Sequence, residues 1–466
     1  MLDRRRFLTA AVAAMSAPAL VRAEPLLRPP PRPLPDARRL AGRAALPGQV
    51  AFALLDQDGQ AGPQDLALAT AAIAPASTMK AITALYVLDR IGPARRFTTQ
   101  VIRAGDMLVL AGGGDPVLST DDLAALAAQL AARGEPAPAR FAVWGGTLPN
   151  LPRIAPEQAE HLPYNPAISG MMLNFNRVHL GWARAGGEWQ MNIEARGTAA
   201  SPRAFTISAT ADVQPQLFGY RSDDAHEYWS VQRAALGTGG SRWLPVRLPE
   251  LYAGDVFQTL CRARGLTLPA PEIIDRLPQG EVLASHDSPP VRDLIRDMLR
   301  YSTNITAEVL GLHASGAPDL PASGQRMQAW LNGAGLGQGM VLSDHSGLGE
   351  ASRMSVLEMA RVMAGPGREM NLTSLLRRNP LEGDPSGGPI RGEVAAKTGT
   401  LNFVSNLAGF VTSPAGRQGS FAIFCIDPAR RDAAIGQEMP AGVSQWTRGA
   451  KAVQRDLLAA FAARLG

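Results

Sequence analysis

Lysine is almost absent from this sequence of 466 residues. Of 46 lysine and arginine residues, only Lys80, Lys397 and Lys451 are lysines. Arginine therefore supplies nearly all of the positive charge, and a guanidinium does not lose its proton in proteins. A lysine ammonium does so when it is desolvated. Each of the three lysines is therefore a candidate for acid–base chemistry.

The chain also has little net charge and no long apolar run. Its net charge is +5, and residues 1–23 contribute +3, so residues 24–466 carry only +2. A nucleic-acid-binding surface needs more positive charge, clustered on one face. We therefore expect no nucleic-acid partner. No stretch reaches the 18 apolar residues of a membrane-spanning helix, so we expect no stable transmembrane anchor.

Cysteines and histidines are few and do not have the spacing of a metal site. The six histidines form no His-Glu-x-x-His pair, so the sequence predicts no metal. Cys261 and Cys425 are the only cysteines, and two thiols in an oxidising compartment can pair. Cys425, however, lies in the apolar run 421–426, which is typical of a buried strand. The sequence leaves the pairing open.

The N-terminus has the three-part pattern of a bacterial export signal. Arg4-Arg5-Arg6 precedes a mildly apolar run, residues 7–20, and Val21-Arg22-Ala23 ends the run with a small residue. Paired arginines followed by Phe-Leu are typical of a twin-arginine signal. We therefore predict that residues 1–23 are an export signal and that the mature protein is periplasmic. The proline-rich residues 24–47 are predicted to form an extended linker.

Hydrophobic periodicity divides the rest of the chain into two kinds of region. Residues 99–283 consist of short alternating runs with many glycines and prolines, which predicts a β-rich insert of one or two small domains. Helical and strand patterns alternate in residues 48–98 and 284–466, which predicts an α/β sandwich domain interrupted by the insert. Strands are predicted at 49–55, 188–196, 205–212, 393–400, 406–412 and 420–426, and helices after Pro75, at 291–299 and at the C-terminus.

Two short motifs contain two of the three lysines. Ser77 and Lys80 stand three residues apart at the start of a predicted helix, so they share one face, and a neutral Lys80 there can take the proton of the Ser77 hydroxyl. Lys397 and Thr398 occur in an apolar strand and offer a cation and a hydroxyl to a carboxylate. Either motif alone has an ordinary structural explanation. Because two of the only three lysines fall in these motifs, a catalytic or substrate-binding role is favoured over the structural explanation.

A third element, Ser302-Thr303-Asn304, follows the predicted helix 291–299. Alone it is typical of a helix terminus. The order Ser-x-x-Lys, Ser-x-Asn, Lys-Thr-Gly is close to the signature of β-lactamases and penicillin-binding proteins. No Gly-x-Ser-x-Gly elbow supports a Ser-His-Asp hydrolase, and the Gly-rich turn 112–115 lacks the lysine of a phosphate-binding loop.

With these motifs in place, the chain resembles the serine D-Ala-D-Ala carboxypeptidase/endopeptidase family of low-molecular-mass, class C penicillin-binding proteins. The similarity runs from about residue 48 to about residue 428 and includes the stretches 75–80, 112–116, 174–176, 285–290 and 344–348. Ser77 and Ser302 stand 225 residues apart, and this family is known for large domains inserted between those two motifs. The sequence departs from the family pattern at Thr303 and at Gly349-Glu350, where Ser-Arg is usual.

The resemblance implies a β-lactamase/transpeptidase-like fold and a serine DD-peptidase that needs no cofactor. Such an enzyme cleaves the terminal D-Ala-D-Ala bond of peptidoglycan stem peptides through an acyl-enzyme and is acylated by β-lactams. The sequence leaves open the balance between this carboxypeptidase action and the cleavage of peptide cross-links. The implied catalytic residues are Ser77 as nucleophile, Lys80 as base, Ser302 as proton carrier and Asn304 as positioning group. The implied substrate-binding residues are Lys397, Thr398, Gly399 and Thr400, and the oxyanion is held by the N–H groups of Ser77 and Thr400.

Two alternatives stay open at this stage. A class A β-lactamase has similar motifs but a short connection between them, and it needs a Glu-x-x-Leu-Asn loop. The nearest string here, residues 328–332, begins with Gln328. A non-catalytic peptidoglycan-binding protein of the same fold has no need of a base such as Lys80.

Overall fold

The computed structural model describes residues 36–382 and 390–466. The predicted export signal, residues 1–23, lies outside the described residues, and of the predicted linker only residues 36–47 are described. Within the described ranges, no helix combines the length and the hydrophobicity that crossing a membrane requires.

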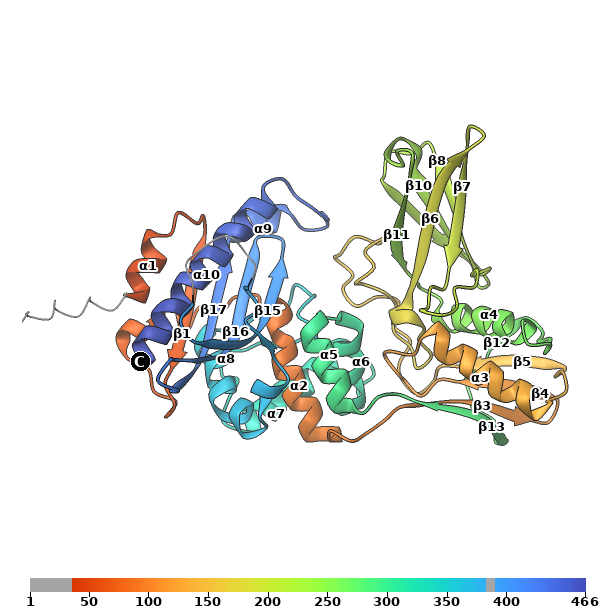
Figure 1. Ribbon diagram of the computed structural model, residues 1–466, viewed down its shortest axis with the longest axis horizontal. Helices are drawn as coiled ribbons and strands as arrows, with labels where there is room; N and C mark the ends of the chain where they lie inside the picture. Colours follow the sequence, from red (N-terminus) through yellow and green to blue (C-terminus); the bar gives the residue numbers. More distant parts are fainter. Residues whose placement is uncertain (1–35, 383–389) are drawn as a thin grey trace, which may run out of the picture. The chain divides into compact units, whose positions relative to one another are not determined.

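A six-stranded sheet forms the framework of the region that contains the three motifs (Figure 1). Its strands are β1 (Gln49–Leu55), β2 (Leu66–Ala67), β14 (Arg377–Arg378), β15 (Glu393–Leu401), β16 (Val404–Thr412) and β17 (Gln418–Ile426). Their order is β14-β15-β16-β17-β1-β2, and every neighbouring pair is antiparallel. Segments from the two ends of the described chain therefore build one sheet.

Helices cover both faces of this sheet (Figure 1). They are α1 (Ala37–Arg43), α2 (Met79–Ile91), α5 (Val291–Tyr301), α6 (Asn304–Ser315), α7 (Leu320–Gly333), α8 (Val356–Val362) and α10 (Val443–Leu465). The short helix α9 (Pro428–Ala433) follows β17. Phe421 and Ile423 of β17 pack with α1 and α10, whereas Ala422 and Phe424 face the cluster that contains α2 and α8. Successive strand residues point to opposite faces, so burial on both faces accounts for the nearly continuous apolar run in β17.

The insert contains three further sheets and two helices. The elements are β3 (Thr98–Ala104), β4 (Met107–Ala111), α3 (Thr120–Arg133), β5 (Arg140–Trp144), β6 (Arg177–Ala185), β7 (Glu188–Glu194), β8 (Ile207–Asp212), β9 (Phe218–Ser222), β10 (Glu227–Gln232), β11 (Gly239–Pro245), α4 (Pro249–Arg262), β12 (Pro271–Ile273) and β13 (Glu281–Asp287). The strand orders are β12-β5-β4-β3-β13, β11-β6-β7 and β8-β10-β9. Phe141 of β5, Val178 of β6 and Trp229 of β10 belong to one hydrophobic cluster with Phe257 of α4, so the three sheets share a core.

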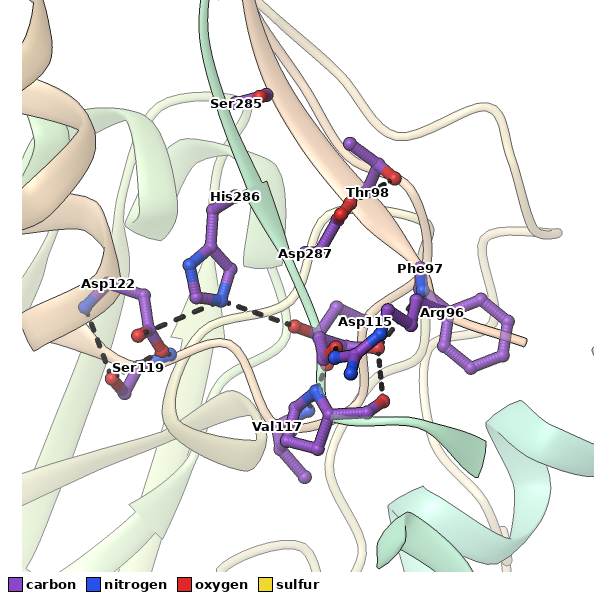
Figure 2. Close-up of polar contacts among 12 residues, drawn as sticks. Arg96, Phe97, Thr98, Asp115, Val117, Ser119, Asp122, Ser285, His286 and Asp287 are labelled. Carbon is purple, nitrogen blue, oxygen red and sulfur yellow. Dashed lines mark hydrogen bonds and ion pairs between the residues drawn. The ribbon is translucent and has the colours of Figure 1, made fainter. Parts of the chain in front are cut away.

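The insert is joined to the sandwich where β3 begins and β13 ends. There the Thr98 hydroxyl donates to an Asp287 carboxylate oxygen at 2.6 Å (Figure 2). The N–H of Phe97 donates to the Ser288 hydroxyl at 3.0 Å. His286 of β13 lies 3.7 Å from a carboxylate oxygen of Asp122 (Figure 2). The first two contacts hold the connecting segments side by side, and the third joins β13 to α3.

The structure differs from the sequence-based expectation in several places. Residues 37–43, expected within an extended linker, form α1, because the Asp36 carboxylate caps the N–H groups of Arg38 and Arg39. Helices α3 and α4 were not predicted, and both predicted boundaries of the insert fall inside strands, 98/99 in β3 and 283/284 in β13. Both cysteines are buried and unpaired, which answers the question of their pairing.

Candidate active site

Ser77 lies in a single 3₁₀ turn that leads directly into α2. The side-chain amide of Asn406, on β16, donates to the Pro75 carbonyl oxygen at 3.0 Å and ties the turn to the sheet. Ala76 adopts a φ of +48°, and a Cβ at Gly347 would collide with the Ala76 carbonyl oxygen. Only a glycine therefore allows the 344–348 segment to approach so closely. Ser77 is half-buried between two buried neighbours, so the turn presents the Ser77 side chain to the solvent side.

Lys80, one turn further along, has no exposed surface. Its Nζ donates to Ser77 Oγ at 2.9 Å, to Asn304 Oδ1 at 2.8 Å and to the Ser346 carbonyl oxygen at 2.8 Å. These three acceptors match the three protons of an ammonium group. Burial lowers the pKa of Lys80 to about 7, with nearby carboxylates opposing the shift. Burial is thus the principal cause of a pKa that permits a neutral amine at neutral pH.

Lys397, on β15, is the second buried lysine, with 2% of its surface exposed. Its Nζ donates to Ser302 Oγ at 2.9 Å and to the Thr398 carbonyl oxygen at 2.7 Å. Ser302 occupies the left-handed region, with φ of +60°, between α5 and α6. Burial holds the pKa of Lys397 well below its usual value, and the charge of Lys80 adds to this effect. The two lysines therefore join all three sequence motifs into one hydrogen-bonded group.

Asn304 begins α6 and links the motifs to the insert. Its Oδ1 accepts from Lys80, and its Nδ2 donates to the Tyr164 carbonyl oxygen at 3.0 Å. A carbonyl accepts only from the NH₂ end of an amide, and an ammonium donates only to the oxygen end. The two contacts therefore agree on one orientation of the Asn304 amide.

Strand β15 presents an open edge beside Ser77. Among the described residues, β14 pairs with β15 only at Ala395 and Ala396, so residues 397–401 have no strand partner on that side. A Cβ at Gly399 would lie 3.0 Å from the Ser77 nitrogen, so the glycine allows the strand to pass close to the turn. The edge borders a cleft of about 540 Å³. Its lining includes Ser77, Gln158, Tyr164, Ser302, Asn304, Glu350 and Thr400.

Two buried carboxylates near Lys80 were missed by the sequence analysis. Glu308 of α6 has no exposed surface, and Asp344 is 3% exposed. Burial raises the pKa of both groups. The signal for Glu308 is present in the sequence, because it is the only charged residue in the helical stretch 305–312. Asp344 lies in the stretch 344–348, which is similar to the family pattern but implies no chemical role by itself.

The departure from the family pattern at Gly349-Glu350 also has a structural counterpart. The Glu350 carboxylate pairs with Arg431 at 2.5 Å, and its backbone N–H donates to Glu157 of the insert at 2.7 Å. The Ser352 hydroxyl donates to Asp344 at 2.9 Å. Glu350 therefore places an ion pair at the wall of the cleft.

Known proteins are similar to this chain both in sequence and in fold. The family model for D-Ala-D-Ala carboxypeptidase 3 (S13) matches residues 64–449. A D-alanyl-D-alanine carboxypeptidase from Actinomadura sp. (strain R39) is 26% identical over 396 residues, which cover 73% of this chain and 71% of that protein. The D-alanyl-D-alanine carboxypeptidase DacB of Haemophilus influenzae is 30% identical over 195 residues, 38% of this chain and 41% of that protein.

The crystal structure of penicillin-binding protein 4 (dacB) from Haemophilus influenzae superposes with a TM-score of 0.71 at 18% identity, covering 89% of this chain and 98% of that one. This likeness confirms the predicted fold class, a β-lactamase/transpeptidase-like α/β domain with an insert. The family match spans most of the sequence, including all three motifs. The chain therefore belongs to the D-Ala-D-Ala carboxypeptidase 3 (S13) family of serine peptidases.

Proposed function

We propose that this protein removes the terminal D-alanine of peptidoglycan stem peptides through an acyl-enzyme on Ser77. The observation that carries the proposal is the hydrogen bond between Ser77 Oγ and Nζ of the buried Lys80. A serine becomes a nucleophile when an adjacent base takes its proton, and a binding protein has no use for such a pair.

The first step forms a bond between Ser77 Oγ and the carbonyl carbon of the penultimate D-alanine. Neutral Lys80 takes the hydroxyl proton, and the N–H groups of Ser77 and Thr400 hold the oxyanion. Ser302 passes a proton to the departing nitrogen as the C–N bond breaks, while Asn304 holds Lys80 and the substrate amide. Water then attacks the ester carbonyl carbon, and the bond from this carbon to Ser77 Oγ breaks. One proton of the water passes to Ser77 Oγ, and its hydroxyl stays on the shortened peptide as the new carboxyl group. Cleavage of cross-links follows the same steps with a longer leaving group.

The open edge of β15 is suited to an extended peptide. A peptide can add to an exposed strand edge by main-chain hydrogen bonds, and residues 397–401 offer that edge beside the nucleophile. Lys397 and Thr398 then lie where the peptide ends, so their side chains bind the terminal carboxylate. Gly399 lets this edge lie close to the turn that carries Ser77, because a Cβ there would crowd the backbone of the turn.

Replacing the terminal carboxylate of the peptide by a carboxamide is expected to lower kcat/KM by ~10- to 100-fold. The neutral amide loses charge-assisted hydrogen bonds of about 1.5–3 kcal/mol to Lys397 and Thr398. Paired kinetics on the two peptides measure this difference. Equal rates on both would remove the carboxylate site from the proposal.

A second measurement tests the acyl-enzyme directly. Brief incubation with benzylpenicillin is expected to add the mass of one penicillin to the intact protein, located on Ser77 by peptide mapping. Rapid loss of the drug without an adduct would point to a β-lactamase instead. An intact drug and an unmodified protein that also fails to cleave a D-Ala-D-Ala peptide would favour a binding protein.

The proposed substrate, peptidoglycan, requires that the enzyme is exported from the cytoplasm. Residues 1–23 carry the pattern of a twin-arginine export signal, so we infer a periplasmic enzyme. Separation of cell fractions, with and without the change Arg4-Arg5 to Lys-Lys, tests this placement.

A further inference from the structure

Glu308 is a buried carboxylate that the proposed mechanism does not use. It follows Asn304 by four residues on α6, so the two side chains share a helix face. One Glu308 oxygen accepts the N–H of His345 at 2.9 Å, and the other accepts the N–H of Ser346 at 2.8 Å. The carboxylate therefore holds the 345–346 segment by both of its oxygens.

The 345–346 segment also contacts Lys80, through the carbonyl oxygen of Ser346. The Ser346 carbonyl oxygen accepts from Lys80 Nζ at 2.8 Å, so Ser346 binds Glu308 through its N–H and Lys80 through its C=O. The His345 carbonyl also accepts from Thr83, one turn after Lys80 on α2, at 2.7 Å. A change at Glu308 thus reaches Lys80 through one residue.

We propose that Glu308 is the positioning residue of Lys80. It holds the Ser346 carbonyl against Nζ and supplies the buried negative charge that Lys80 faces. This inference rests on the proposed function, because it assigns Lys80 as the base that activates Ser77.

The charges around Lys80 give the sign of the expected effect. The charged groups that face it are Glu308 of α6, Asp344 of the 344–348 segment and Lys397 of β15. Glu308 is the largest of the influences that raise the pKa of Lys80 against the effect of burial, and Asp344 follows. Burial raises the pKa of Glu308 to about 8, whereas the two backbone N–H groups that its oxygens accept favour the ionised form. Removal of the charge of this ionised form lowers the pKa of Lys80. More of the amine is then neutral at a given acidic pH.

A purely structural carboxylate elsewhere in the chain provides a matched control. Glu358 of α8 is 7% exposed, and its carboxylate accepts the N–H of Gly337 at 3.0 Å. It also pairs with Arg361 at 2.6 Å. Glu358 therefore performs the same kind of backbone anchoring, but it has no contact with the Ser77–Lys80 pair.

The test is the second-order rate of acylation by benzylpenicillin between pH 5 and pH 9, followed by intact mass. In the wild-type protein we expect the rate to fall tenfold per pH unit below about pH 7, as Lys80 becomes protonated. In E308Q we expect this acidic limb to move to lower pH by about one pH unit. The plateau should fall about tenfold, because glutamine can accept only one of the two backbone N–H groups. E358Q should retain the wild-type profile.

E308D tests the charge of Glu308 separately from its anchoring of the 345–346 backbone. It also replaces E308Q in the test if E308Q does not fold. It keeps the charge and shortens the side chain, so its acidic limb should stay near that of the wild type while its plateau falls. The inference would be overturned if the acidic limb of E308Q coincided with that of the wild type, or if E358Q showed an equal shift of its limb. It would also be overturned if E308D kept the plateau rate of the wild type. A wild-type protein that is never acylated would overturn the proposed function itself, whereas an unmoved limb in an active protein overturns the inference alone.

Discussion

Ser77→Ala is expected to abolish release of D-alanine from a D-Ala-D-Ala peptide, with a loss of ~10³- to 10⁶-fold in kcat. Without Oγ no acyl bond can form, and the residual rate reflects only binding and oxyanion stabilisation by the remaining groups. Removal of one oxygen from a half-buried turn should leave the melting temperature nearly unchanged. The release assay and thermal unfolding of the same preparation measure both effects.

Ser444→Ala is the matched control for this change. Ser444 is an exposed serine of α10 that also lines the cleft, so it tests whether any serine near the substrate serves as nucleophile. We expect Ser444→Ala to keep both the penicillin adduct and the peptidase activity. Full activity in Ser77→Ala, or an adduct that moves to another serine, would contradict the assignment of the nucleophile.

Lys80→Arg is expected to be nearly as damaging, with a loss of ~10²- to 10⁴-fold in the acylation rate. Arginine keeps the charge but cannot give up its proton, so it cannot act as the base. The guanidinium is also larger than the ammonium that fits among Ser77, Asn304 and Ser346. Single-turnover acylation by benzylpenicillin measures the loss without interference from deacylation.

The same substitution at another lysine distinguishes loss of the catalytic base from a general effect of replacing lysine by arginine. Lys451→Arg alters a residue of α10 at the cleft and preserves its charge, so we expect a rate within about twofold of the wild type. A Lys80→Arg protein that acylates at the wild-type rate across the pH range would show that another group takes the serine proton.

The hydrogen-bonded group around Ser77 was predictable from the sequence only in part. Helical geometry places Lys80 beside Ser77, because a separation of three residues is one turn. No local rule brings Ser302 to Lys397, 95 residues further on. That meeting was predicted only from the order of the motifs and the resemblance to a family. Hence the pairs within one element follow from spacing, and the pairs between elements depend on the fold.

Glu308 could not be assigned a role before the structure was available. Its place in an apolar helix marks it as unusual, but its partners are backbone N–H groups of residues 345 and 346. Nearly every residue carries a backbone N–H, so the sequence does not show which of these groups a buried carboxylate will bind. The same reason explains why the carbonyl of Tyr164 was not foreseen as a partner of Asn304.

Secondary structure was most predictable in the strands of the sandwich. β1 spans the predicted residues 49–55, while β16 and β17 each begin two residues before the predicted start. Helix α3 was missed although Leu123, Leu126 and Leu130 have helical spacing and Ser119 with Asp122 forms a capping box. The abundance of glycine and proline in the surrounding insert concealed this local pattern.

The bond from Asn304 to the Tyr164 carbonyl limits how the insert can diverge in evolution. An insertion or deletion between β5 and β6 that shifts this carbonyl leaves the solvent-exposed amide of Asn304 to water, so its orientation beside Lys80 is held less firmly. Recombination that exchanges whole inserts between relatives would meet the same barrier. The segment around residue 164 should therefore be inherited together with the Ser-x-Asn motif, while the tips of the distant hairpins vary freely.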